Sequence, residues 1–227
     1  MSYLLRLVLP DRPGILGAVA TALGDAGIDI VSLDVIERYG GVAVDDVVVE
    51  LPRDRLPDSL ITVAQAVPGV TVESLRPFPG LLDTHRELEL LESLARADEG
   101  TAVKLLAAEL PRVFHSGWSV VLEAMDPDSG GVSSWTVSAT SDAAPHFEGL
   151  SVPWMPLREP LLLPSEGDWL PQRWRDMAIE MMAAPYGGPG CALVLGRSGG
   201  PAYRRTELAR LAHLAGVAST LVALPPA

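Results

Sequence analysis

The sequence Asp11-Arg12-Pro13-Gly14 separates two stretches of different periodicity and constrains how the first third of the chain can fold. Residues 3–9, which precede it, are apolar and rich in residues that favour strands. After it, apolar residues recur at helical spacing over 15–23, and Gly27 ends the repeat. Proline suits the first position of a helix, so the helix is expected to begin at Pro13. The turn therefore predicts a strand that passes directly into a helix.

The same alternation of patterns continues along the first 77 residues. Further strands are predicted at 29–38, 42–51 and 70–75, with a second helix over 60–67. The predicted order is β-α-β-β-α-β, the split βαβ arrangement of ferredoxin-like folds. Residues 76–80 contain two prolines and indicate a stiff linker.

Two adjacent acids, Asp45 and Asp46, interrupt the valine-rich third strand. Neighbouring residues of a strand face opposite sides of the sheet, so one acid should point toward the helix layer unless a β-bulge intervenes. A bulge or the end of the sheet is the favoured interpretation, and a cation site is the alternative.

The remaining residues predict a second α+β domain with a central antiparallel sheet. Helices are expected at 82–97, 101–114, 169–176 and 206–221, and strands at 118–125, 135–139, 161–163, 178–184 and 191–196. Residues 141–177 are rich in proline and form a long segment between the two strand pairs. We therefore predict two domains, at residues 1–77 and 78–227.

Charge and composition limit the classes of function. Seventeen Lys and Arg residues against 29 Asp and Glu give a net charge of −12, which argues against nucleic acid and anionic membrane surfaces as partners. Cys191 is the one cysteine and the four histidines are scattered, so neither a disulfide framework nor a metal site is expected, and no cofactor is predicted. Lys104 is the only lysine, which indicates a GC-rich bacterial genome. No export signal or membrane span is recognisable, so a cytoplasmic protein is expected.

The sequence Leu9-Pro10-Asp11-Arg12-Pro13-Gly14-Ile15-Leu16, followed by Gly27-Ile28-Asp29-Ile30, resembles the ACT domain family. The resemblance covers residues 1–77 and implies a regulatory domain that binds an amino acid between two copies. Carried over by position, it implies a ligand site formed by Asp11, Gly14, Ile15, Leu16, Asp29 and Ile30.

The chemistry of this turn supports such a site independently of the family. Backbone N–H groups at a helix N-terminus favour a carboxylate, and Asp11 and Asp29 can accept hydrogen bonds from an ammonium group. The alternative is that Pro13 and Gly14 only make a tight connection, Asp11 helps to cap the helix, and the domain serves for dimerisation alone.

The order of elements after residue 80 resembles the GAF domain family, as does the sequence between Ala192 and Leu208. This resemblance implies a small ligand beneath residues 141–177. The tryptophans of this domain are interpreted mainly as core residues.

A hydrolase is the remote alternative, because residues 196–200 fit the G-x-S-x-G pattern with Ser198 as nucleophile. Two glycines and a proline separate that serine from the next helix, no aspartate follows it, and His213 lies on the closing helix. The sequence thus predicts a regulatory homodimer that is not an enzyme and binds an amino acid, with a ligand-free interaction scaffold as the second possibility.

Overall fold

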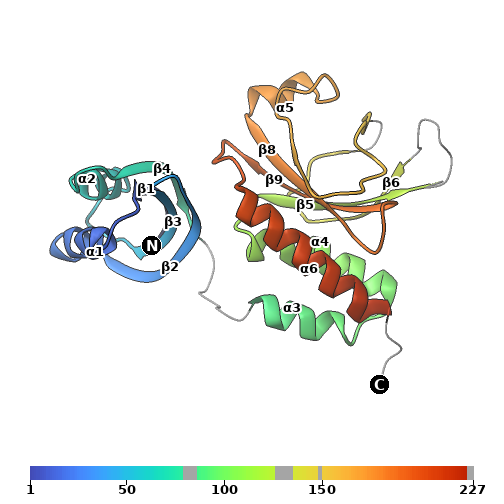
Figure 1. The fold of residues 1–227 in the computed structure, drawn as a ribbon, viewed down its shortest axis with the longest axis horizontal. Helices are drawn as coiled ribbons and strands as arrows, with labels where there is room; N and C mark the ends of the chain where they lie inside the picture. The colour runs from blue at the N-terminus through green and yellow to red at the C-terminus, as the bar shows by residue number, and fades with distance from the viewer. Residues whose placement is uncertain (79–85, 126–134, 148–149, 224–227) are drawn as a thin grey trace. The chain divides into compact units, whose positions relative to one another are not determined.

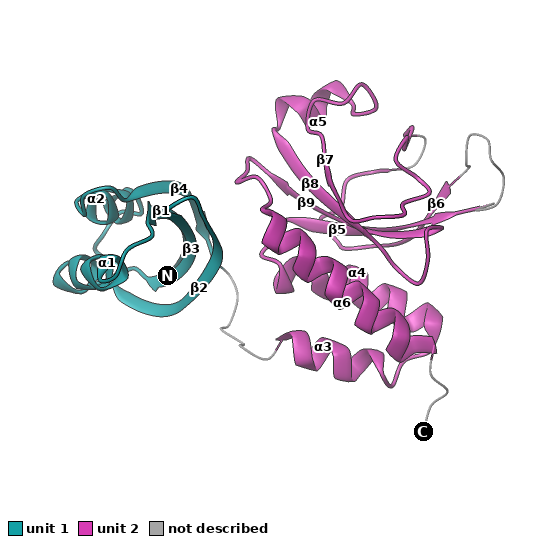
Figure 2. Ribbon diagram, in the orientation of Figure 1, with its two compact units in different colours: residues 1–83 teal, residues 84–227 magenta. Residues whose placement is uncertain are grey.

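The computed structural model describes residues 1–78, 86–125, 135–147 and 150–223, and divides the chain into two compact units, residues 1–83 and 84–227 (Figures 1 and 2). Each unit has its own antiparallel sheet and its own helices, which confirms the predicted α+β class. Among the described residues, no helix is both long and apolar enough to cross a bilayer.

Unit 1 has the predicted ferredoxin-like order β-α-β-β-α-β, with both helices on one side of the sheet (Figure 1). Its elements are β1 (Ser2–Pro10), α1 (Ile15–Asp25), β2 (Asp29–Tyr39), β3 (Val42–Glu50), α2 (Asp58–Gln65) and β4 (Thr71–Pro77). The strands lie in the order β2-β3-β1-β4, and every neighbouring pair is antiparallel. Strand β2 therefore forms one edge of the sheet.

The pairing of β1 with β3 is continuous over nine residue pairs, from Ser2 opposite Glu50 to Pro10 opposite Val42. Side chains alternate along these strands, and one face packs against α1 and α2. The core on that face includes Leu5, Leu7, Leu9, Val47 and Val49 from the strands with Ile15, Val19, Leu23, Leu60 and Ala64 from the helices.

The expectation of a bulge at Asp45 and Asp46 is wrong, because β3 pairs with β1 without a break there. Irregularities in register fall on the neighbouring strands instead, at Ile30–Ser32 and Val35–Glu37 in β2 and opposite Arg6 and Leu7 in β4. The two acids consequently face opposite ways. Asp45 lies opposite Leu7, on the helix side, and Asp46 lies opposite Arg6, on the other side.

Asp46 is fully paired. Arg6 donates from Nε to Asp46 Oδ1 at 2.7 Å and from Nη2 to Oδ2 at 2.8 Å, and both side chains are buried. This two-bond geometry is the strongest form of carboxylate–guanidinium contact.

Unit 2 places helices on both faces of a five-stranded sheet (Figure 1). Its elements are α3 (Arg86–Leu94), α4 (Glu99–Val113), β5 (Trp118–Ala124), β6 (Trp135–Thr140), β7 (Leu161–Leu163), α5 (Gln172–Asp176), β8 (Ile179–Pro185), β9 (Cys191–Ser198) and α6 (Arg205–Ala223). The strand order is β6-β5-β9-β8-β7. Helices α3, α4 and α6 share one hydrophobic core with the sheet, and α5 and the segment before it share another on the opposite face.

Three predicted boundaries need correction. Pro13 lies before α1, which begins at Ile15, because Gly14 adopts a left-handed conformation that the helix cannot contain. Arg76 and Pro77 pair with β1, so they extend β4 and are not linker residues. Helix α5 begins at Gln172, after Pro171, and not at residue 169. Phe78 is described, and the rest of the predicted linker, residues 79–80, lies outside the described residues.

A buried ion pair joins β9 to α6. Arg197 Nη2 donates to Glu207 Oε1 at 2.8 Å, and the same guanidinium lies 3.8 Å from the centre of the Tyr203 ring. Glu207 Oε2 accepts from the backbone N–H of Arg204 at 2.8 Å, at the start of α6. These contacts fix the position at which α6 enters the unit.

Removing one partner of this pair should destabilise unit 2. Glu207→Ala leaves Arg197 buried without its carboxylate and should lower the free energy of unfolding by about 3–5 kcal/mol. Glu92→Ala removes the carboxylate of an exposed pair with Arg96 and should change it by less than about 1 kcal/mol. Urea unfolding of the two variants tests this, and equal midpoints would contradict it.

Candidate functional site

The turn between β1 and α1 presents an open helix N-terminus. Gly14 precedes the helix with φ 86°, in the left-handed region that glycine tolerates, and within the described chain no side chain caps α1. The turn is held by a hydrogen bond from the Asp11 backbone N–H to the Gly41 carbonyl at 2.8 Å. Gly14 is exposed, Leu16 is half-buried, and the Ile15 side chain lies in the core, while the Ile15 backbone N–H donates a long hydrogen bond to the Arg12 carbonyl at 3.4 Å. An uncapped N-terminus of this kind favours a bound anion.

Asp11 is already engaged by a side chain that the sequence interpretation missed. Arg38, near the end of β2, donates from Nε to Asp11 Oδ1 at 3.1 Å and also from Nη2 to the same oxygen. Strands β1 and β2 run parallel, so the end of β2 lies at the same edge of the sheet as the turn after β1. That topology was predictable, and a basic residue near the end of the second strand could have been included in the site.

Asp29 and Ile30 lie at the opposite end of the sheet from the turn. Asp29 pairs with Glu50 at one end of β3, whereas Pro10, next to Asp11, pairs with Val42 at the other. Nine strand residues separate these ends by roughly 25 Å. Within one chain, therefore, the six predicted residues form two groups that do not meet, and Ile30 packs partly into the core.

Asp45 is the unexpected member of the group at the turn. Its residue exposure is 1%, and within the described part of the chain neither carboxylate oxygen has a hydrogen-bond partner. Burial raises the pKa of Asp45, Arg38 acts in the opposite direction, and Asp46 and Asp11 raise it further. Asp45 thus lies within electrostatic reach of the Asp11–Arg38 pair.

The second unit offers less to a polar ligand. Trp118 of β5 packs against Phe147 and Trp174, which belong to the segment 141–177, with the centroids of the three rings 5.0–6.2 Å apart. Phe147 and Trp174 are almost completely buried. Trp118 and Trp174 are thus core residues, as the interpretation of the tryptophans predicted.

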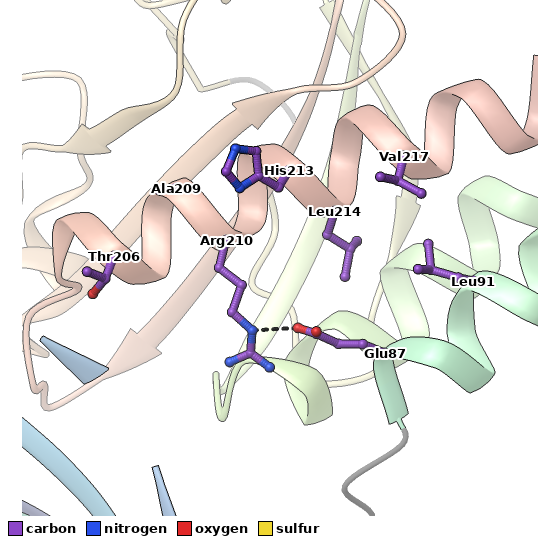
Figure 3. Close-up of a pocket in the computed structure, with 8 residues that line it drawn as sticks. All are labelled: Glu87, Leu91, Thr206, Ala209, Arg210, His213, Leu214 and Val217. Atoms are coloured by element: carbon purple, nitrogen blue, oxygen red, sulfur yellow. Dashed lines mark hydrogen bonds and ion pairs between the residues drawn. The ribbon is translucent and has the colours of Figure 1, made fainter. Parts of the chain in front are cut away.

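A groove of about 430 Å³ lies between α3 and α6 (Figure 3). Its lining is mainly apolar, and its charged residues, Glu87 and Arg210, form an ion pair with each other at 2.5 Å. His213 is exposed on the same face of α6. Because the two charged lining residues pair with each other, neither is available to bind the charged groups of an amino acid.

The residues of the remote hydrolase alternative are not assembled. Glu207 is bound to Arg197, Ser198 is exposed at the end of β9, and His213 lines the groove beside Arg210. Among the described residues, no hydrogen bond joins any two of Ser198, Glu207 and His213 in the way a catalytic triad requires.

Comparison with known proteins agrees with the fold of unit 1. Residues 3–69 match the family model of the ACT domain, which confirms the predicted resemblance. A search of curated proteins gave no match. The ACT match supports a regulatory, ligand-binding role in general terms.

Similar solved structures were found for both parts of the chain. An ACT domain protein from Streptococcus pneumoniae shares 15% identity, with 36% of this chain and 98% of that chain covered and a TM-score of 0.29. A formyltetrahydrofolate deformylase from Pseudomonas putida KT2440 shares 17% identity over 42% of this chain and 37% of its own, with a TM-score of 0.29. The A. aeolicus nlh2 GAF domain, in an inactive state, shares 10% identity over 60% of this chain and 93% of its own, with a TM-score of 0.40.

Replacement of glycine by alanine should have opposite effects on stability at Gly14, which has a left-handed conformation, and at Gly17, which lies inside α1. Gly14→Ala should lower the free energy of unfolding by about 1 kcal/mol, because an added Cβ meets open space but the backbone is strained. Gly17→Ala, inside α1 and equally open, should raise it by roughly 0.5–1 kcal/mol. Chemical denaturation measures both, and a shift of the same sign would contradict the turn geometry.

Proposed function

We propose that this chain is a non-catalytic regulatory protein whose ACT domain binds an amino acid between two copies. The observation that carries the proposal is the uncapped N-terminus of α1 at Gly14, with the Asp11 carboxylate in the same turn and the Asp45 carboxylate within electrostatic reach of Asp11. The N–H groups suit the ligand's carboxylate and the acids suit its ammonium group. A zwitterion is the small molecule that matches both halves of this arrangement.

A second copy is needed to complete the site. Asp29 and Ile30 lie at the far end of the sheet, and β2 is an edge strand with unpaired backbone groups. If two β2 strands pair antiparallel across a two-fold axis, the start of one lies beside the end of the other. Asp29 of the second copy would then approach Arg38 and the α1 turn of the first.

Exposed apolar side chains on β2 support this dimer. Val31, Leu33 and Val35 are 38%, 39% and 51% exposed, an unusual set of apolar side chains for a free sheet edge. The same surface also supports the alternative function, a dimerisation scaffold without a ligand. Binding of an amino acid distinguishes the two.

A thermal-shift screen against the standard amino acids tests the proposed function. An amino acid at 100 times its dissociation constant should add about 2.7 kcal/mol to the free energy of unfolding. At least one amino acid should raise the melting temperature. A screen in which none does so would favour the scaffold.

The dimer is expected to depend on the apolar edge. Light scattering should give about twice the 24.1 kDa mass of one chain, and Val35→Asp should give the mass of a single chain because it places a charge on the pairing edge. Val217→Asp changes a residue of similar exposure, 47%, on α6 and should leave the dimer intact. A wild-type monomer would remove the interfacial site.

Asp29→Ala should weaken amino-acid binding without affecting the fold. Loss of one charge-assisted hydrogen bond to the ammonium group should cost about 1.5–3 kcal/mol of binding free energy. Asp29 is exposed at a strand end, so the melting temperature without ligand should hardly change. Asp54→Ala, at an exposed acid in the loop after β3, is the control, and calorimetry that gives both variants the wild-type affinity would exclude Asp29 from the site.

A further inference from the structure

Asp45 occupies a position where the fold calls for an apolar residue. Its neighbours on the helix-facing side of β3, Ala43 and Val47, belong to the hydrophobic core, and so does Leu7 opposite it on β1. An ionised carboxylate that is buried without a partner destabilises a protein, because it loses its hydration and gains no hydrogen bond or opposite charge in return. Asp45 therefore opposes the stability of unit 1, which is common for residues that serve a ligand.

The charged groups that act electrostatically on Asp45 come from three places. Arg38 lies on β2, Asp11 lies in the turn before α1, and Asp46 is its neighbour on β3. Asp46 is bound to Arg6 on the other side of the sheet, so it does not compete for a cation here. Arg38 is bound to Asp11, and its side chain is 64% exposed.

The guanidinium of Arg38 thus lies near two carboxylates but forms hydrogen bonds with Asp11, while Asp45 has none among the described residues. An exposed side chain of this length can swing out into water at little energetic cost. Val35 of β2, which pairs with Asp45 of β3, is itself half exposed, so Asp45 lies next to the exposed edge strand of the sheet.

We propose that Asp45 receives the ammonium group of the bound amino acid and that Arg38 occupies this cation position in the free protein. The inference rests on the proposed function and deepens it, because it names Asp45 as the main acceptor of the ammonium group and Arg38 as the side chain that the ligand displaces. An ammonium group is compact and has three donors, so it can reach a buried carboxylate that a planar guanidinium does not reach. The carboxylate of the same ligand lies at the N-terminus of α1.

The stability of the free protein tests the first half of this inference without any ligand. Because the folded pKa of Asp45 is raised above its ordinary value of 3.8, the folded state binds the proton more tightly than the unfolded state. Wild-type stability should therefore fall, relative to Asp45→Asn, as the pH rises from 3.8 through the folded pKa, and stay lower above it. An Asp45→Asn variant that is less stable than wild type at neutral pH would overturn the inference, since it would show that Asp45 has a structural partner.

Binding of matched ligands tests the second half. Each standard amino acid that binds is compared by calorimetry with the 2-hydroxy acid of the same side chain, which lacks the ammonium group. Wild type should prefer the amino acid by roughly tenfold or more, and Asp45→Asn should lose that preference. Arg38→Gln should bind the amino acid more tightly than wild type, because the internal competitor is gone. Asp54→Asn is the control for a general loss of negative charge.

The outcomes separate the two proposals. If no amino acid binds to wild type, the proposed function itself fails. If an amino acid binds equally well to wild type and Asp45→Asn, the ligand site stands and this inference is overturned. If Arg38→Gln weakens binding as Asp45→Asn does, Arg38 holds the ligand directly and the assignment of Arg38 as a competitor is overturned.

Discussion

Continuous antiparallel pairing between β1 and β3 determines on which face of the sheet each charged side chain of unit 1 lies. Because no residue is inserted between Ser2 and Pro10 or between Val42 and Glu50, the alternation of side chains is preserved along both strands. The same pairing places the α1 turn at one end of the sheet and the start of β2 at the other. A shift of one residue would exchange the faces of Asp45 and Asp46, so that Asp46 and not Asp45 would face the helices.

The two adjacent acids of β3 have different partners because they lie on opposite faces of the sheet. Asp46 meets Arg6 in a buried pair with two hydrogen bonds, which satisfies both oxygens. Asp45, one residue away, faces aliphatic side chains and has no such pair among the described residues. Loss of either partner of the Arg6–Asp46 pair would destabilise the folded chain, because it would leave the other charge buried without its partner. The unpaired Asp45 lowers the stability of the folded chain and can bind a cation.

Much of the fold was predictable, because strands and helices differ in the period of their apolar residues and the D-x-P-G turn marks a strand-to-helix connection. The positions of Asp11 and Gly14 at that turn followed from the same pattern. The separation of Asp29 from Asp11 within one chain also follows from the parallel direction of β1 and β2. The orientation of Asp45 did not follow, because a bulge in β3 and bulges in β2 and β4 give the same local sequence pattern. The Asp11–Arg38 pair depends on side-chain conformations at the sheet edge that sequence periodicity does not describe.

We propose that the N-terminus of α1 and the carboxylate of Asp45 form one amino-acid site with the start of β2 from a second copy. Two-dimensional NMR of the isotopically labelled chain, titrated with the standard amino acids, tests this site. We expect the amide signals of Gly14, Ile15 and Leu16, the side-chain carboxyl carbon of Asp45 and the amide of Asp29 to shift together with one shared dissociation constant. Shifts confined to residues of unit 2, or shifts at the turn that leave Asp45 unchanged, would contradict it.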